Sequence, residues 1–344
     1  MHLRQLSLRH YRNYPKKDFS FSSGTTLVVG PNAVGKTNLL EAIYLLATGK
    51  SFRAELEEEM ISYGQVMANV SGLLSNKEKL AIILTTGQVL GKRVAKKIYR
   101  VNGVNRRMVD FLGNLKVVYF GPEDLEIIID SPSIRRNYLD SVLEQTDREY
   151  RRASVSYKKG LRQRNKLLEQ IREEGMPRSV LYFWDKLLIE NGDMITKKRT
   201  EFIDFINQQP EYFGKLQVAY DNSLISPERL AKYENEEVAA GMTLVGPHRD
   251  DFQVSLDKRN LHAYGSRGEQ RTAIFSIKLA ELEFITAKSQ TRPILLLDDI
   301  FSELDHEHRK HLLEIIPHQQ TIITTTDIHL IELDYRKKID ITKL

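Results

Sequence analysis

Cysteine is missing from this sequence, and its absence excludes disulfides and thiolate metal sites. Long hydrophobic runs are missing as well: no stretch approaches the roughly 20 apolar residues that a membrane-spanning helix needs. The first residues, 1–6, are too polar for a signal peptide, so we expect a cytoplasmic protein with no membrane partner. The net charge of +5 over 344 residues is mild and does not by itself indicate a nucleic-acid partner.

The distribution of charge is more informative than its sum. Basic residues dominate the stretch 148–166, in which Glu149 is the one acid. A second basic cluster covers residues 92–107. Either cluster could be a solvated surface, so the sequence leaves open which of them contacts a polyanion. In the first cluster the predicted contact residues are Arg151, Arg152, Lys158, Lys159, Arg162 and Arg164.

Patterns along the chain predict three segments. Residues 1–125 alternate apolar and polar side chains like strands, with Asn102-Gly103 as a hairpin turn. Residues 126–235 are polar and helical, and the break Gly175-Met176-Pro177 predicts two long antiparallel helices. Residues 236–344 return to a strand, loop and helix pattern. The predicted fold is therefore α/β, with a head that is split in sequence by an inserted helical arm subdomain.

The strongest motif lies between an apolar strand, 26–29, and an amphipathic helix. Its glycines let backbone N–H groups turn toward the β- and γ-phosphates of a nucleotide, Lys36 adds a positive charge, and the Thr37 hydroxyl can ligate Mg²⁺. The spacing and both flanking elements predict an ATP-binding site in which Lys36 also serves catalysis. The motif reads G-x-x-x-x-G-K-T and comprises Gly30, Pro31, Asn32, Ala33, Val34, Gly35, Lys36 and Thr37.

A second motif places two carboxylates at the end of an apolar strand. Residues 294–297 predict a buried parallel strand, and ligands bind at the C-terminal ends of such strands. We expect Asp298 to hold Mg²⁺ and Asp299 to act as the general base on the attacking water. The doubled acid and the residues 300–305 after it resemble the Walker B motif and D-loop of ABC-type ATPases.

A weaker motif, Ser266-Arg267-Gly268, stands at the start of a predicted helix. A small hydroxyl residue and a glycine there can form an anion site or can simply cap the helix. Its place before the Walker B strand resembles the ABC signature motif, although Arg267 replaces the second glycine. In ABC ATPases this motif faces ATP held by a second chain, so the resemblance implies an ATP-dependent homodimer. Threonines 324–326 stand where the switch histidine is expected, and we therefore expect slow hydrolysis.

Several short motifs occur in the order that is found in the bacterial RecF recombination-mediator family. The resemblance covers essentially the whole length and implies an ABC/SMC-type ATPase head. It also implies that Arg12 and Asn13 lie by the nucleotide. The motifs are Tyr11-Arg12-Asn13-Tyr14, Gly49-Lys50-Ser51-Phe52-Arg53, Pro122-Glu123-Asp124-Leu125, Ser131-Pro132-Ser133-Ile134-Arg135-Arg136 and Gly246-Pro247-His248-Arg249-Asp250-Asp251.

The resemblance also implies a function. Members of the RecF family are ATP-dependent DNA-binding proteins of recombinational repair that dimerise on ATP and bind duplex DNA near single-strand gaps. With the partner proteins RecR and RecO they help to load the RecA recombinase, and hydrolysis releases the dimer. We therefore expect ATP and Mg²⁺ as cofactors and a slow, DNA-dependent ATPase. The residues alone leave two alternatives open, a transporter cassette and a non-hydrolysing scaffold.

Overall fold

The computed structural model describes residues 1–211, 213–302, 304–326 and 340–344. The chain forms two compact units, of which the first comprises Met1–Leu125 with Glu281–Leu344 and the second Glu126–Ala280. The boundary at residue 125 coincides with the predicted one. The chain returns to the first unit at residue 281, whereas the predicted third segment begins at residue 236. The intervening strands remain in the second unit because they pair with one another and pack on its helices.

A six-stranded antiparallel sheet with the order β2-β1-β4-β5-β8-β9 forms one layer of the first unit. The predicted turn Asn102-Gly103 joins its last two strands, and the φ angles of 51° and 81° at these residues are those that a two-residue hairpin turn requires. A short hairpin, β6 (Gln88–Val89) and β7 (Lys92–Arg93), lies between β5 and β8 in the chain. The sheet strands are β1 (Leu3–Tyr11), β2 (Tyr14–Ser20), β4 (Met67–Leu74), β5 (Lys79–Thr85), β8 (Lys97–Val101) and β9 (Val104–Arg106).

A parallel sheet with the order β10-β14-β15-β3-β16 forms the second layer. The predicted strand before the two carboxylates is confirmed as β14, whose residues are all buried between parallel neighbours. Because parallel strands end at the same edge of a sheet, the loop after β3 and the acids after β14 share one edge, on either side of β15. The strands are β10 (Val117–Phe120), β14 (Ile294–Asp298), β15 (Thr321–Thr325), β3 (Thr25–Val29) and β16 (Asp340–Lys343).

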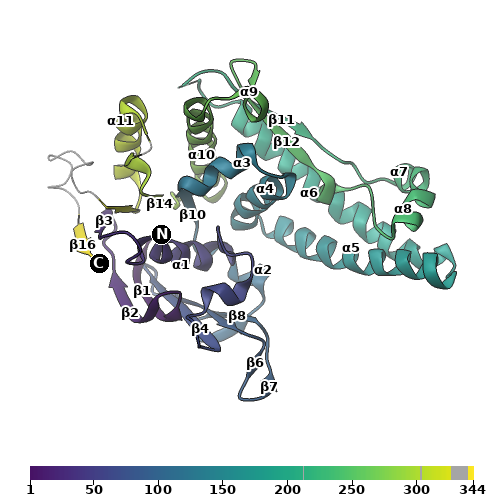
Figure 1. The fold of residues 1–344 in the computed structure, drawn as a ribbon, viewed down its shortest axis with the longest axis horizontal. Coiled ribbons are helices and arrows are strands. Elements are labelled where there is room, and N and C mark those ends of the chain that lie inside the picture. Colours follow the sequence, from purple (N-terminus) through teal and green to yellow (C-terminus); the bar gives the residue numbers. More distant parts are fainter. Residues whose placement is uncertain (212, 303, 327–339) are drawn as a thin grey trace. The chain divides into compact units, whose positions relative to one another are not determined.

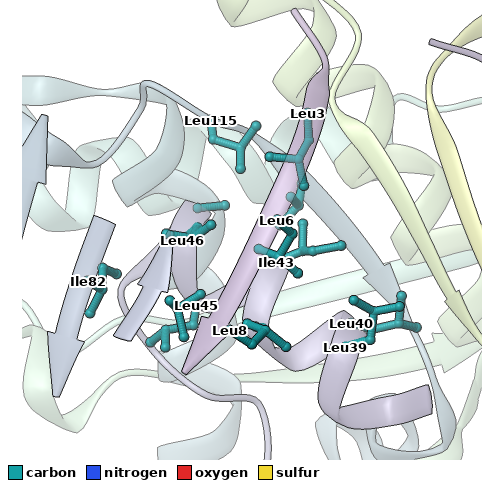
Figure 2. Packing of buried hydrophobic residues seen from close by; sticks show 14 of the residues in the cluster. Leu3, Leu6, Leu8, Leu39, Leu40, Ile43, Leu45, Leu46, Ile82 and Leu115 are labelled. Atoms are coloured by element: carbon teal, nitrogen blue, oxygen red, sulfur yellow. The ribbon is translucent and has the colours of Figure 1, made fainter. Parts of the chain in front are cut away.

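Helix α1 (Lys36–Thr48) lies between these two layers and contacts strands of both. Each fully buried leucine contributes about 2 kcal/mol of hydrophobic stabilisation, so the helix is held firmly along its length. The phosphate loop at its N-terminus therefore begins from a fixed element. Figure 2 shows the core around α1, with Leu39, Leu40, Ile43, Leu45 and Leu46 packed among Leu3, Leu6 and Leu8 of β1 and Ile82 of β5.

Two other helices of the first unit are α2 (Met108–Phe111) and α11 (His306–Ile315). In the part of the chain that the structure describes, no helix has the length and apolar character needed to cross a membrane.

The second unit is mainly helical (Figure 1). Its sheet has the order β11-β12-β13, from strands β11 (Leu216–Asp221), β12 (Asp251–Leu256) and β13 (Arg259–Asn260). Helix α10 (Arg267–Ser289) begins here and ends in the first unit. The other helices are α3 (Glu126–Ile129), α4 (Pro132–Thr146), α5 (Arg148–Glu174), α6 (Tyr182–Asn207), α7 (Pro227–Lys232), α8 (Glu234–Ala240) and α9 (Leu261–Tyr264).

The predicted antiparallel arm is present as α5 and α6. The two helices approach closely at Gly160, where a Cβ atom would lie 2.5 Å from Leu187 Cδ2. One detail differs from the prediction of two long helices, since the stretch before Gly175 forms two helices, α4 and α5, rather than one. The break is at Asp147, whose carboxylate accepts hydrogen bonds from the backbone N–H groups of Glu149 and Tyr150 and so caps α5.

Candidate nucleotide-binding site

The phosphate loop connects β3 to α1 and has the backbone conformation of an anion-binding nest. Ala33 and Gly35 both have positive φ, 64° and 115°, which turns successive N–H groups toward one side of the loop. Lys36 is buried and its ammonium donates to the carbonyl oxygens of Gly30 at 2.7 Å and Pro31 at 2.9 Å. Its charge is thereby held inside the loop, where the phosphates of a nucleotide would offer equivalent acceptor oxygens.

The β1–β2 hairpin holds this loop in place. Asn13 Nδ2 donates to the carbonyl of Val34 at 2.9 Å, and the Tyr14 hydroxyl donates to the carbonyl of Gly35 at 3.0 Å. A Cβ atom at position 35 would lie 2.8 Å from the Asn13 amide and would displace it from the loop, and the φ of 115° there itself favours glycine. Asn13 thus lies against the phosphate loop; that it also lies by the nucleotide stays a prediction of the resemblance.

A buried carboxylate on α1 binds two arginines beside the loop. Arg12 forms a two-point ion pair with Glu41, with Nε–Oε2 and Nη2–Oε1 distances of 2.8 and 2.6 Å. Arg53 contacts the same carboxylate at 3.2 Å, and the Ser51 hydroxyl donates to it at 2.5 Å. Burial alone would raise the pKa of Glu41, but the hydrogen bonds from Arg12, Ser51 and Arg53 outweigh it and hold that pKa below the ordinary value. Arg12 is therefore fixed by Glu41, and the 49–53 motif supplies the second arginine.

An open cavity of about 800 Å³ adjoins the phosphate loop within the first unit. This volume lies in the range of small-molecule sites. The hairpin supplies Arg12 and Asn13, of which Asn13 also contacts the loop, and the rest of the wall comes from Asn38 of α1, Arg53 and residues between 58 and 65. The lining residues are Arg12, Asn13, Asn38, Arg53, Glu58, Glu59, Ile61, Ser62, Tyr63, Gly64 and Gln65.

The two predicted carboxylates stand at the C-terminal end of β14. Asp298 is buried and accepts a hydrogen bond of 2.5 Å from the Thr324 hydroxyl of β15. Asp299 has a φ of 50°, and its backbone N–H donates to the carbonyl of Thr324 at 3.2 Å. Burial, followed by the neighbouring Asp298 charge, raises the pKa of Asp299 above its ordinary value. A raised pKa is a property that suits a general base.

Two partners of Asp298 were not predicted. Thr324, one of the three threonines that stand where the switch histidine is expected, donates to Asp298, as just described. Tyr119 of β10 lies within 3.4 Å of Asp298 and donates a shorter hydrogen bond, 2.6 Å, to Glu123. Burial and then the Asp298 charge raise the pKa of Tyr119 far above the usual range, so it stays a proton donor. Of the predicted D-loop, Glu303 lies outside the described residues.

These side chains fit a magnesium nucleotide. Thr37, at the first turn of α1, and Asp298 carry the oxygen donors that Mg²⁺ prefers. Over residues 1–211, 213–302, 304–326 and 340–344, no cluster of three or more His, Cys, Asp and Glu side chains could hold a metal ion alone. A magnesium ion here would therefore depend on nucleotide phosphates for part of its shell, as is usual for this ion.

The predicted signature residues begin α10 in the second unit. Ser266 and Glu269 form a capping box, in which the Ser266 N–H and hydroxyl both donate to Glu269 Oε2 at 2.8 Å. Ser266, Arg267 and Gly268 are exposed, and a Cβ at Gly268 would meet no atom within 4 Å. In a single chain Ser266 therefore caps the helix, which was one of the two predicted roles. The exposed motif remains accessible to a partner chain.

The structure contradicts two of the predicted polyanion contacts in the arm. Arg164 is buried and binds Asp185 and Glu237, each at 2.7 Å. Arg151 is also buried, and its guanidinium donates to the carbonyl of Glu144 at 2.7 Å. A phosphate cannot reach either side chain without unfolding its surroundings.

The other predicted arm residues differ in their availability. Lys158 is half exposed but pairs with Asp140 at 2.7 Å. Arg152, Lys159 and Arg162 are exposed on one face of α5. In the second basic cluster Lys96, Lys97 and Arg107 are in ion pairs with acids, and Lys92, Arg93 and Arg106 are exposed.

Comparison with known proteins gives matches that extend over nearly the whole chain. The family model described as "RecF/RecN/SMC N terminal domain" matches residues 2–342. The DNA replication and repair protein RecF of Halalkalibacterium halodurans is 37% identical, and the match covers 95% of this chain and 93% of that protein. RecF of an Exiguobacterium species is 36% identical over the same shares. The chain belongs to the RecF family.

Solved structures agree with this RecF assignment. A structure of the recombination mediator protein RecF with ATP, in the RecFOR pathway, has a TM-score of 0.87 at 32% identity and covers 96% of this chain and 93% of its own. A second RecF structure, named RecF-ATPrS, has the same TM-score and covers 100% of this chain and 96% of its own. An SMC head domain from Pyrococcus furiosus, with 17% identity and a TM-score of 0.51, shares the fold. The predicted α/β ABC/SMC-type head is thus confirmed.

Proposed function

We propose that this RecF-family chain is an ATP-driven DNA-binding protein of recombinational repair. The observation that carries the proposal is the phosphate loop, held from outside by Asn13 and Tyr14 and filled from inside by the Lys36 ammonium. The α1 N-terminus, the Lys36 charge and the nest of N–H groups all favour a polyanion at this point. Relatives whose structures are named for ATP and ATPrS complexes support ATP as that ligand.

The cavity beside the loop is the proposed place for the nucleoside part of ATP. Asn13 lines this cavity and also donates a hydrogen bond to Val34 of the phosphate loop. A ligand whose phosphates occupy the loop therefore has its sugar and base directed into the cavity. Arg12 and Arg53 line it and remain positioned by Glu41.

Hydrolysis is assigned to the carboxylates at the end of β14. When bound, Mg²⁺ supplies charge neutralisation for the phosphates, with Thr37 and Asp298 as its protein ligands. Thr324 donates to one Asp298 oxygen, and the Tyr119 hydroxyl lies 3.4 Å from the other. Asp299 takes the proton of the attacking water. A threonine in place of the switch histidine supports slow turnover, which DNA binding accelerates.

Completion of the site requires a second chain. Ser266, Arg267 and Gly268 are exposed in one chain, and Glu269 occupies the Ser266 donors. We propose that the γ-phosphate bound by another copy replaces the Glu269 carboxylate, so that ATP joins two heads. Hydrolysis then removes this link and releases the dimer.

Duplex DNA, next to single-strand gaps, is the proposed ligand of the dimer. Of the predicted arm contacts, Arg152, Lys159 and Arg162 have exposed side chains, and Lys158, half exposed, pairs with Asp140. Phosphate contacts of this kind give salt-dependent binding without sequence readout. The RecFOR pathway named for the solved relatives supports RecR and RecO as partners. The proposed outcome, implied by the family resemblance, is RecA loading.

The test is fluorescence anisotropy of a labelled gapped duplex with the full chain. Binding is measured with ATP–Mg²⁺, without nucleotide, and with Lys36→Met in ATP–Mg²⁺. We expect binding that needs ATP and is lost in the variant. DNA binding that is indifferent to ATP and to Lys36 would separate the nucleotide site from DNA binding, and no DNA binding would overturn the proposal.

A further inference from the structure

Tyr63 projects from the wall of the cavity into solvent. Its relative exposure is 105%, the highest of any large apolar or aromatic side chain that the structure describes. Exposure alone says little, because single apolar residues are common on protein surfaces. The position of this ring is more informative, since it lines the same cavity as Arg12 and Asn13.

A tight turn presents the ring. The Gln65 N–H donates to the carbonyl of Ser62 at 3.0 Å, and Gly64 has a φ of 76°. This combination is that of a type II turn, which needs a positive φ at its third residue and therefore favours glycine there. Tyr63 occupies the second position, at the outer corner of the turn.

The turn is fixed to the hairpin that holds the phosphate loop. The Ser62 N–H donates to the carbonyl of His10 at 2.8 Å, and the Ser62 hydroxyl donates to the carbonyl of Arg12 at 2.7 Å. The next residue, Asn13, bonds to Val34 in the phosphate loop at 2.9 Å. Tyr63 is thus connected to the loop through a short series of hydrogen bonds, and its Cα is held in place before any ligand binds.

The chemistry of the cavity matches a nucleotide in two parts. Near the loop, the polar side chains of Asn13, Asn38 and Arg12 line the cavity. A purine base is flat and largely apolar on its faces, and a tyrosine ring offers the matching surface. We infer that Tyr63 is the platform on which the base of the bound nucleotide stacks, an inference that rests on the proposed nucleotide function.

Stacking of this kind contributes affinity and little base choice, because every base has an aromatic face. Replacement of Tyr63 by alanine is expected to weaken ATP binding by about fivefold to a hundredfold, the range of single base–aromatic stacks. Tyr63→Phe keeps the ring and is expected to bind ATP like the wild type.

Isothermal titration calorimetry tests this with two ligands, ATP–Mg²⁺ and inorganic tripolyphosphate–Mg²⁺. Tripolyphosphate has no base, so its binding is expected to be unchanged in Tyr63→Ala. The control variant is Tyr182→Ala, which removes another exposed tyrosine, 73% exposed, from the second unit. It is expected to leave both ligands unaffected.

The outcomes separate this inference from the proposed function. Unchanged ATP binding in Tyr63→Ala would overturn the stacking role alone. Equal losses of ATP and tripolyphosphate binding would also overturn it, because they would show that Tyr63 acts on the phosphate site. A wild-type chain that binds neither ligand would overturn the proposed function and the stacking role with it.

Discussion

Glu41 forms ion pairs with two arginines beside the nucleotide site. Its side chain is fully buried against Arg12 and Arg53. Glu41→Ala would leave two guanidinium groups without their carboxylate, and removing one partner of a buried pair costs about 3 kcal/mol or more. We expect a clear loss of unfolding free energy in urea. Asp18→Ala, which breaks an exposed pair with Arg9, is the control and is expected to change little.

The pH dependence of this pair has a defined sign. Because the folded pKa of Glu41 lies below its ordinary value, the stabilisation is present above that ordinary value and is lost as the pH falls through the folded pKa. Urea unfolding of the wild type should therefore show a loss of stability in acid that is smaller in Glu41→Gln. An identical acid loss in both proteins would place the titrating group elsewhere.

Asp299→Asn tests the general base. The substitution preserves size and removes the proton acceptor, and general-base catalysis commonly contributes 100-fold or more to the rate, so we expect a loss of about that size. ATP binding should persist. Because burial and Asp298 raise the pKa of Asp299, wild-type hydrolysis should fall as acid protonates this residue. A variant that hydrolyses ATP at the wild-type rate would show that the base lies elsewhere.

Single functional residues can be predicted from the sequence where they belong to a motif with a distinctive spacing. They are missed where their contacts form only when distant parts of the chain come together. The phosphate loop and the two acids are local motifs, and the structure places them at one sheet edge. Glu41 and Tyr63 carry no such signal, because each acquires its partner or position from a distant part of the chain. Thr324 is marked in the sequence by its place at the switch-histidine position, but its hydrogen bond to Asp298 is not. Glu41 did have one weak sign, a charged residue on the helix face of Leu40 and Leu45, all buried.

Helix α5 shows what a charge run can and cannot indicate. The basic stretch looked uniform in sequence, yet Arg164 faces inward with Tyr157 and Leu168, which lie seven residues before it and four after it. That periodicity was available in the sequence and marks the buried face. Arg152 and Lys159 have the spacing of the opposite, exposed face. The division of the predicted helix at Asp147 depended on a cap that ordinary composition does not reveal.

Arg162 and Arg164 therefore make a matched pair of substitutions. Arg164→Met leaves Asp185 and Glu237 without their cation, so we expect a markedly lower melting temperature by circular dichroism. Arg162→Met should melt like the wild type and bind gapped duplex more weakly. Wild-type DNA affinity in Arg162→Met would mean that the arm face is only a solvated surface and would direct attention to Lys92 and Arg93.

The division into two units was recognisable from composition at residue 125, where the helical insertion begins. The return at Glu281 was not, because β11 and β12 have the strand pattern of the head and belong to the second unit through their mutual pairing. The consequence for function is that the phosphate loop and the signature residues stand on different units of one chain. Complete sites in a dimer would use Lys36 of one copy and Ser266 of the other.

That arrangement predicts complementation between two inactive proteins. Lys36→Met removes the phosphate contact, and Ser266→Arg blocks the signature face, so each variant alone should lack ATPase activity. A mixed dimer has one site with both defects and one with an intact Lys36 and an intact Ser266. We therefore expect an equimolar mixture of the two variants to regain part of the wild-type rate in a phosphate-release assay. As a control, the doubly substituted chain is mixed with wild type; dimers of the two have a defect in each site, so only the remaining wild-type dimers should be active. Activity that stays absent in the mixture would place Ser266 in the site of its own chain or outside catalysis.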